Sequence, residues 1–365
     1  MQPLRILVTS GYGYWGDFLP TDLEKGERQV GGGETAMIQV SRALAKLGHS
    51  VTVFHDCPPG RYDGVDYLPR NLLPALICQL EHDVYVSWDE PHAFRWADRS
   101  ALHVLAFQLN DSLVGVFDHA IDLYFHPSEW HVERFLTLYP ELSRDKCRAR
   151  FTNGIDLSRY VSSEPLLRQG HRIIYSSSPD RGLHHLLRFW PRIREAVADA
   201  ELHVFYDMDK WLEIDAQMKE KGLANITRER AELLRPLRDA PPPGVTFHGG
   251  VGQAQLAREQ LQSAVLAYPC DPVAPTEGFS MTCLEAITAG CHLITTDADA
   301  LKELWADAPD STILPLPIND DVWVDTLVKA LQDGRGDPSP QGWKPYTWTS
   351  VAKKWEKEFA ACLKS

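Results

Sequence analysis

The sequence of 365 residues has no apolar run long enough to cross a membrane, since no segment approaches the ~18 consecutive apolar residues that a spanning helix needs. Its first residues, MQPLRILVTSG, lack the basic and apolar stretch and the small-residue cleavage site of a secretory signal. They have the pattern of a first strand of a domain. We therefore expect a cytoplasmic protein, with peripheral membrane contact left open.

Cysteine is scarce and scattered. The seven cysteines show neither the CxxC nor the CxH spacing of a metal site, and a chain of this length does not need a disulfide framework. Basic residues are outnumbered, and the net charge of −13 disfavours broad, salt-driven binding of nucleic acid. A GxGxxG fingerprint that opens a helix is also missing: the nearest glycines, Gly11, Gly13 and Gly16, lead into a long aromatic loop. This argues against a nicotinamide-dependent dehydrogenase.

Short apolar runs alternate with helical patterns along almost the whole chain, which is typical of parallel sheets covered by helices on both faces. The alternation breaks near residues 155–170 and then starts again. We therefore predict an α/β protein with two Rossmann-like, doubly wound domains that face a central cleft. The first domain is expected at 1–160 and the second at 165–340, with ligands beyond the carboxyl ends of the strands.

The last segment, 345–365, has an amphipathic helical pattern with Trp348, Trp355 and Phe359 on one face. Such a face must pack on something. We expect this helix to return to the first domain.

The stretch 264–290 contains the most informative chemistry. A buried strand ends near Pro269, a loop follows, and a helix starts near Ser280, where free backbone N–H groups favour an anion. Glu277 precedes this helix and Glu285 lies within it. In a continuous helix they would be roughly 10–12 Å apart at ~1.5 Å per residue, too far for a carboxylate dyad. The spacing suits two carboxylates that hold different hydroxyls of one extended ligand, with a diphosphate near the helix start.

Residues 276–285, TEGFSMTCLE, resemble the signature of the retaining GT-B glycosyltransferases of family 4, two glutamates separated by seven residues. The resemblance implies that Glu277 contacts the hydroxyls of the donor sugar and that Glu285 contacts the ribose. It also implies that the backbone of three residues between them faces the sugar and phosphate: Gly278, Phe279 and Ser280. The donor would be a nucleotide-diphosphate sugar.

Two further turns are similar to this family. Residues 31–35, GGGET, resemble its glycine turn, so Gly32 and Gly33 are expected to approach the donor phosphates. Residues 175–183, YSSSPDRGL, resemble the segment that brings a basic side chain to the diphosphate, and Arg181 is the candidate for stabilising the leaving group. Many members have a second cation about five residues earlier, where this chain has Ser176.

Acceptor contacts are expected in the first domain, where this family usually determines acceptor specificity. The family often has a histidine in the cleft after a central strand, and Asn110 or Asp111 occupies that place here. The other candidates are Tyr14 and Trp15 in the aromatic loop and Asp89 at the end of a strand.

Two patterns that could suggest a metal site have simpler interpretations. Asp207 and Asp209 form an Asp-x-Asp motif, but they lie before a helix, where aspartate commonly caps. His184 and His185 are adjacent on a predicted helix, so their side chains should point in different directions. We expect no bound metal and no cofactor besides the donor.

The sequence thus predicts a metal-independent retaining glycosyltransferase with Arg181 and Glu277 as catalytic residues. Alternatives with the same fold are a nucleotide-sugar epimerase, a phosphorylase, or an inactive nucleotide-sugar binding protein, which Ser176 and Asn110 keep open. The acceptor stays open among a glycan, a lipid-linked sugar, a small molecule and a macromolecule.

Overall fold

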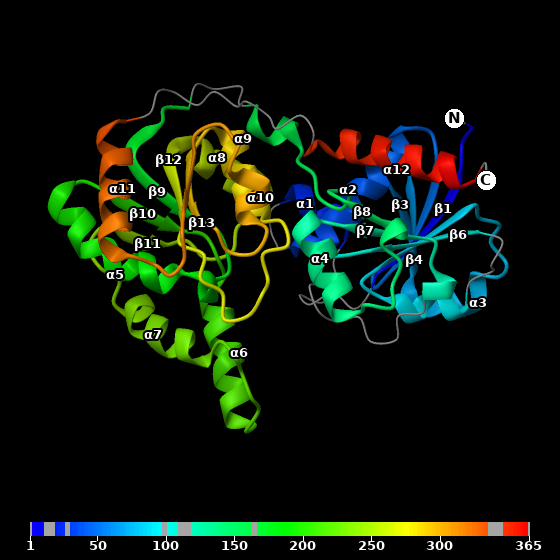
Figure 1. The fold of residues 1–365 in the computed structure, drawn as a ribbon, viewed down its shortest axis with the longest axis horizontal. Helices are drawn as coiled ribbons and strands as arrows, with labels where there is room; N and C mark the ends of the chain where they lie inside the picture. The colour runs from blue at the N-terminus through cyan, green and yellow to red at the C-terminus, as the bar shows by residue number, and fades with distance from the viewer. Residues whose placement is uncertain are drawn as a thin grey trace. The chain divides into compact units, whose positions relative to one another are not determined.

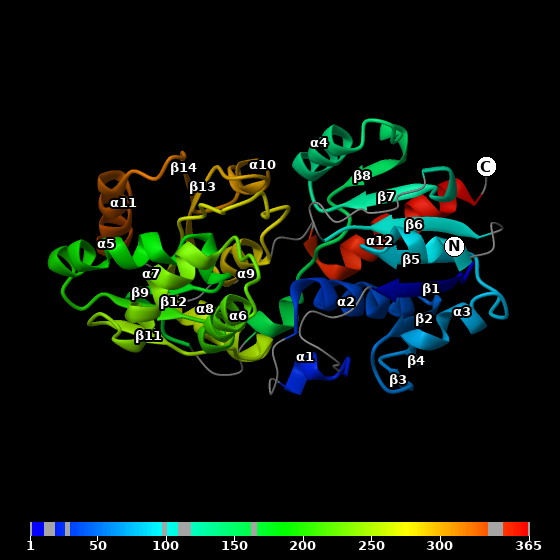
Figure 2. The ribbon, with the colours of Figure 1, turned by 90° about the horizontal axis from the view of Figure 1, so that it is seen from below.

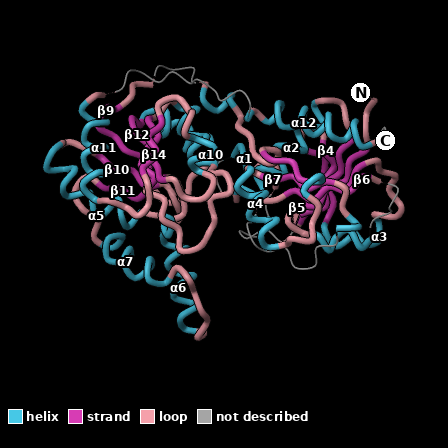
Figure 3. The backbone as a smooth tube through the Cα atoms, viewed as in Figure 1, coloured by secondary structure: helices cyan, strands magenta, loops and turns pink. Residues whose placement is uncertain are grey.

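The computed structural model describes residues 2–10, 19–25, 30–96, 101–108, 118–161, 166–334 and 346–363. The chain divides into two compact units, the first formed by 1–25, 29–156 and 344–365 and the second chiefly by 157–343. In each unit the strands lie inside and the helices outside (Figure 1, Figure 3). No helix among the described residues is long and apolar enough to cross a membrane.

The first unit has, in its described part, a sheet of eight strands in the order β3-β4-β2-β1-β5-β6-β7-β8, parallel except for β3. Figure 2 shows β8 and β3 at opposite edges of this sheet. The strands are β1 (Arg5–Ser10), β2 (Ser50–His55), β3 (Gly60–Tyr62), β4 (Val65–Pro69), β5 (Val84–Trp88), β6 (Leu102–Ala106), β7 (Leu123–His126) and β8 (Cys147–Ala149). The helices are α1 (Asp22–Lys25), α2 (Gly32–Lys46), α3 (Leu73–Leu76), α4 (Glu129–Leu138) and α12 (Trp348–Cys362).

The two faces of the first sheet have separate apolar cores, because successive strand residues point to opposite faces. Ile6 and Val8 of β1 join a core that also contains buried residues of α2 and α12. Leu7, between them, belongs to the core on the other face. Central strands that are apolar on both faces are what a sheet covered on both sides requires.

The C-terminal helix α12 packs beside α2 in the first unit (Figure 1). Trp355 is fully buried, lies 4.9 Å from the ring centroid of Phe125, and donates from Nε1 to the carbonyl of Phe151 at 2.6 Å. At the start of the helix, a Cβ at Gly154 would lie 2.8 Å from the ring of Trp348, so glycine lets this junction close.

The second unit has, among the described residues, a parallel sheet of six strands in the order β11-β10-β9-β12-β13-β14. The strands are β9 (Gln169–Tyr175), β10 (Glu201–Val204), β11 (Val245–Phe247), β12 (Ser263–Tyr268), β13 (His292–Thr296) and β14 (Ser311–Leu314). The helices are α5 (Leu183–Ala196), α6 (Met208–Glu220), α7 (Arg228–Asp239), α8 (Gln253–Gln262), α9 (Met281–Ala289), α10 (Leu301–Trp305) and α11 (Asp320–Gln332). Helices α5 and α11 pack together, as do α8 and α9, and α6 projects away from the sheet (Figure 1).

The boundary between the units lies slightly earlier than the sequence suggests. The turn Leu157–Tyr160, expected at the end of the first domain, belongs to the second unit. Tyr160 is buried there, and its hydroxyl donates to Oε1 of Gln260 at 3.0 Å. This tertiary contact joins the turn to the second unit, and the local composition does not reveal it.

Candidate functional site

The candidate site of the second unit lies where β9 and β12 end, at the carboxyl edge of the parallel sheet. The turn after β9 contains Arg181 and Gly182, and the loop after β12 begins at Pro269. A Cβ on Gly182 would lie 1.9 Å from the carbonyl oxygen of Pro269, and Gly182 has φ +127°. Glycine is therefore required for these two segments to touch, and their contact positions Arg181 beside the second segment.

Arg181 forms an ion pair with Glu277 across this contact. The Glu277 side chain is only 2% exposed, whereas that of Arg181 is 30% exposed. The backbone N–H groups of Thr276 and Glu277 donate to one oxygen of Asp299, at 2.8 and 2.9 Å. The structure thus brings together the two residues predicted to be catalytic, and Asp299 fixes the loop that carries the carboxylate.

Helix α9 begins directly after this loop, and its first turn lacks a side-chain cap. Ser280 is the N-cap residue, with φ +70°, and its hydroxyl donates to Sγ of Cys283 at 3.2 Å. The hydroxyl of Ser176, where the family's second cation was expected, forms a hydrogen bond with Thr282 in the first turn. The helix start carries the partial positive charge that favours an anion.

Gly278 and Phe279, predicted to face the donor through their backbone, are both buried. The Phe279 ring packs edge-on against Trp305, with centroids 5.3 Å apart, and the Phe279 carbonyl accepts from Trp305 Nε1 at 3.1 Å. The side chain of Phe279 thus anchors the loop in the core. The backbone contacts of these two residues with a donor remain a prediction.

Glu285 belongs to a second hydrogen-bonded group on α9. It is partly buried and accepts from Nε2 of Gln260 at 3.3 Å, while Gln260 accepts from the Tyr160 hydroxyl. Burial raises the pKa of Glu285, and the hydrogen bond from Gln260 counteracts part of this effect. Because Gln260 is fully buried, the Tyr160 contact fixes which end of its amide faces Glu285.

In the first unit, Gly32 and Gly33 form the start of α2, after Gly31 as N-cap without a side-chain cap. A Cβ on Gly32 would meet nothing within 4 Å, and one on Gly33 would only touch Gln108 at 3.7 Å. The protein itself therefore does not require glycine here. An approaching ligand would provide a reason for it, so their role as phosphate contacts stays a prediction.

Asp89, predicted to contact an acceptor, holds the carboxyl ends of neighbouring strands together. Its Oδ1 accepts from the backbone N–H of Gln108 at 2.9 Å, and its own N–H donates to Ala106 at 2.9 Å. The Gln108 side chain donates to Asn153 and to the carbonyl of Thr152, each at 3.2 Å. The remaining acceptor candidates lie outside the described residues: Tyr14, Trp15, Asn110 and Asp111.

The expectation that His184 and His185 point in different directions is wrong. Their ring centroids are 3.9 Å apart, and Nε2 of His185 lies 2.8 Å from Oδ2 of Asp271. Rotation about the side-chain bonds brings both rings to one place, although their Cβ atoms leave the helix in different directions. Asp207, in contrast, is the N-cap of α6, and accepts from the N–H of Lys210 at 3.1 Å.

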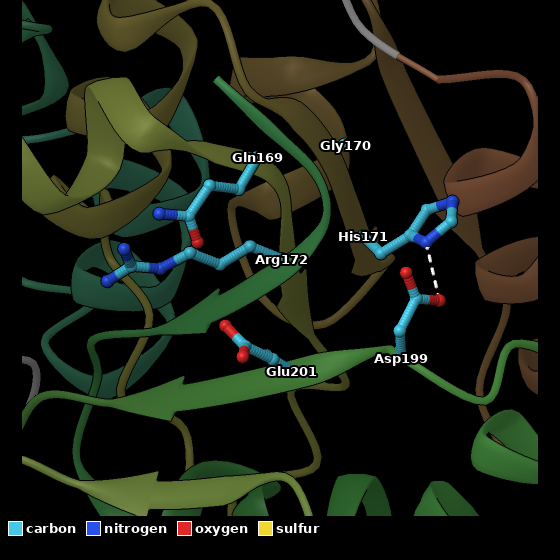
Figure 4. Close-up of a pocket in the computed structure, with 6 residues that line it drawn as sticks. All are labelled: Gln169, Gly170, His171, Arg172, Asp199 and Glu201. Atoms are coloured by element: carbon cyan, nitrogen blue, oxygen red, sulfur yellow. Dashed lines mark hydrogen bonds and ion pairs between the residues drawn. The ribbon is translucent and has the colours of Figure 1, made fainter. Parts of the chain in front are cut away.

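A shallow pocket lies at the opposite, amino end of β9 and β10 (Figure 4). It has a volume of about 350 Å³, and is lined by polar residues, including an exposed pair of His171 and Asp199 at 2.7 Å. Ligands of parallel sheets bind beyond the carboxyl ends of the strands. This pocket is therefore a useful place for control substitutions.

The comparisons with known proteins agree with the fold. Residues 171–333, most of the second unit, match the family model Glycosyl transferases group 1. Three solved structures share the whole fold at low identity. AviGT4, a glycosyltransferase involved in avilamycin A biosynthesis, has 13% identity and a TM-score of 0.66, with 100% of this chain and 99% of that chain covered. WaaG, a glycosyltransferase involved in lipopolysaccharide biosynthesis, has 14% identity and a TM-score of 0.60, with 96% and 95% covered.

Anabaena HepE in complex with UDP-glucose has 13% identity and a TM-score of 0.63, with 98% of this chain and 100% of that chain covered. No protein among the curated sequences matches this chain. The protein has the GT-B architecture that the sequence predicted. Glycosyl transfer is the activity that the family match and this fold support together.

Several residues of the site could not be found by sequence reasoning. Asp299, Gln260 and Tyr160 act through partners 22 or more residues away, such as Glu277 for Asp299 and Gln260 for Tyr160. None of them lies in a recognisable motif. Only the three-dimensional contacts reveal them.

Proposed function

We propose that this protein is a retaining glycosyltransferase that moves a sugar from a nucleotide-diphosphate sugar to an acceptor hydroxyl. The observation that carries the proposal is the ion pair of Arg181 and Glu277 beside the uncapped start of α9, inside the segment that matches the glycosyltransferase family. The pairing of a guanidinium with a helix N-terminus suits a diphosphate leaving group. A buried carboxylate next to it suits the hydroxyls of the donor sugar.

Each residue of the group has a proposed role. Arg181 and the N–H groups at the start of α9 stabilise the negative charge that develops on the diphosphate as the glycosidic bond breaks. Glu277 accepts hydrogen bonds from the sugar, and Glu285 accepts them from the ribose. Retention of configuration follows from the family resemblance. The HepE structure contains UDP-glucose, which makes a uridine nucleotide the first donor to test.

We further propose that transfer does not require a metal ion. Arg181 and the start of α9 would neutralise the charge of the diphosphate, as a metal ion does in other transferases. The Asp-x-Asp motif supports this, because Asp207 caps α6 and Asp209 pairs with Arg238 at 2.8 Å. Transfer measured with and without a chelator should proceed at the same rate. A complete loss in the chelator would contradict this part of the proposal.

Calorimetric titration of the full chain with UDP, GDP, ADP, dTDP and their sugars tests the donor site. One nucleotide should bind preferentially, Glu285→Gln should weaken that binding, and Glu277→Gln should weaken the sugar nucleotide more than the free diphosphate. Asp199→Asn, at the opposite edge of the sheet, is the control and should bind as the native chain does. Absence of binding to every nucleotide by folded native protein would refute the proposal.

An acceptor screen with the preferred donor then separates transfer from the alternatives. Slow donor hydrolysis without acceptor would argue against a protein that only binds nucleotide sugar. NMR of the first transferred product should show the anomeric configuration of the donor. An inverted product would refute retention while leaving glycosyl transfer in place.

A further inference from the structure

A second cluster of polar groups lies beside the donor site, between the first turn of α5, the start of α7 and the loop after β12. It consists of His184, His185, Asp271 and Arg230. Both histidines are more than nine-tenths buried. One nitrogen from each histidine and a carboxylate oxygen of Asp271 lie within 4.8 Å of one another. Three potential metal ligands, two imidazole nitrogens and one carboxylate oxygen, thus converge from two separate segments of the chain.

The positively charged side chain of Arg230 already lies in this cluster. The guanidinium of Arg230 lies between the two sides, hydrogen-bonded to Nε2 of His184 and 3.4 Å from Oδ2 of Asp271. The same oxygen of Asp271 lies 2.8 Å from Nε2 of His185. The Nδ1 atoms of both histidines are buried and have no hydrogen-bond partner among the described residues. The histidines and Asp271 thus surround the guanidinium of Arg230, but both Nδ1 atoms are left without a hydrogen bond among the described residues.

Burial shifts the pKa of both imidazoles in the same direction. Burial lowers the pKa of His184 to about 3, with further lowering by His185 and Arg230. Burial also lowers the pKa of His185, although Asp271 counteracts part of this effect.

We propose that His184, His185 and Asp271 bind a divalent transition-metal ion of the zinc class, which displaces the guanidinium of Arg230. Two nitrogens and one oxygen are a donor set that zinc accepts and that magnesium does not favour. Ligand atoms around tetrahedral zinc are about 3.3 Å apart, given bonds of ~2.0–2.1 Å, so small side-chain rotations would close the site. The Arg230 side chain is 23% exposed and that of Asp271 is 34% exposed, which leaves an open side for entry.

The ion would also connect to the donor site. The backbone N–H of Asp271 donates to the carbonyl of Arg181 at 3.3 Å, so the residue that would bind the metal also contacts the backbone of the donor-site arginine. Binding of the ion is a property of the cluster and does not depend on the proposed transferase activity. The metal-binding test therefore uses no sugar donor, and the metal site and the transferase activity can each be refuted without the other.

Zinc affinity is measured by competition with a chromophoric chelator, with metal-free full-length protein. The native chain should bind one ion at this site, and His185→Gln and Asp271→Asn should each weaken its binding by at least about tenfold. Arg230→Met removes the competing positive charge and should tighten binding by about tenfold. Misfolding does not increase affinity. Arg230→Met therefore still tests the proposal if His185→Gln and Asp271→Asn are unstable.

His171→Gln is the matched control, because His171 forms an exposed pair with Asp199 and belongs to no three-ligand cluster in the described part of the chain. Its zinc affinity should equal that of the native chain. Co²⁺ replaces zinc for absorption spectroscopy and should show ligand-field bands without the near-ultraviolet charge transfer of thiolate ligands. Unchanged affinity in both ligand variants, no tightening in Arg230→Met, or a thiolate spectrum would each overturn the proposal.

Discussion

Substitution of Gly182 by alanine tests whether the contact between the two loops holds the candidate site together. The added Cβ would lie 1.9 Å from the carbonyl oxygen and 2.7 Å from the carbonyl carbon of Pro269. Both are backbone atoms, so no flexible side chain can move aside. The turn carrying Arg181 would have to move away from the loop after β12, and the pairing of Arg181 with Glu277 would weaken.

The loss of stability in Gly182→Ala has two causes, the positive φ and the steric clash. A residue with a side chain loses about 1–2 kcal/mol at positive φ, and Gly182 has φ +127°. Forcing an extra carbon into a packed contact adds about 1–3 kcal/mol. The free energy of unfolding should therefore fall by about 2–5 kcal/mol, which corresponds to a decrease of roughly 5–15 °C in Tm for a unit of this size.

Thermal unfolding of Gly182→Ala and of Gly222→Ala separates the cost of positive φ from the cost of the steric clash. Gly222 lies after α6 and has φ +66°, and a Cβ added there would have nothing within 4 Å, so only the cost of positive φ applies. Nucleotide affinity should fall in Gly182→Ala and stay unchanged in Gly222→Ala. Equal losses of Tm in the two variants would refute the steric argument.

Four further outcomes are expected. Trp355→Ala should lower the free energy of unfolding by about 3–5 kcal/mol, measured by denaturant titration, because a fully buried aromatic of α12 is lost. Gln260→Leu should weaken nucleotide binding up to about tenfold in calorimetry, because Glu285 loses its orienting hydrogen bond. Asp207→Ala should cost about 1 kcal/mol of stability through the lost cap and leave the response of transfer to divalent ions unchanged. For His184, the unfolded state binds more protons between about pH 3 and the ordinary value of 6.5, so stability falls as the pH drops through this window. His184→Phe should make that fall less steep in unfolding experiments at several pH values.

The fold could be predicted because the same local pattern, a short apolar strand followed by a helix, is repeated along the chain. Apolar strands such as Val84–Trp88 are buried on both faces, so their composition alone indicates a sheet covered by helices. The sequence pattern indicates element ends less closely, since α2 starts at Gly32 although helical periodicity becomes visible only from Glu34. The second unit begins at Leu157, and the hydrogen bond between Tyr160 and Gln260 belongs to the contacts that join this turn to it, which local composition does not reveal.

The candidate site could be predicted only where it follows a motif. The spacing of Glu277 and Glu285 is visible in the sequence, but the contact of Asp299 with the backbone before and at Glu277 is not. The prediction for His184 and His185 used the directions in which adjacent residues leave a helix. That rule concerns Cβ atoms, and it does not exclude convergence of long planar side chains on a shared partner such as Asp271.

The ion pair of Arg181 and Glu277 constrains how a donor can bind. A guanidinium has five N–H donors in a fixed fork, and Glu277 engages Nη1 of Arg181, while Nε is buried without a hydrogen-bond partner among the described residues. Arg181 can therefore keep its carboxylate and still has N–H groups left for a second acceptor, and they lie in a rigid plane that a lysine ammonium lacks. A diphosphate bound as proposed would add negative charge to a pair that is neutral overall. In the proposed function, the start of α9, whose first turn lacks a side-chain cap, is the part of the site expected to balance this charge.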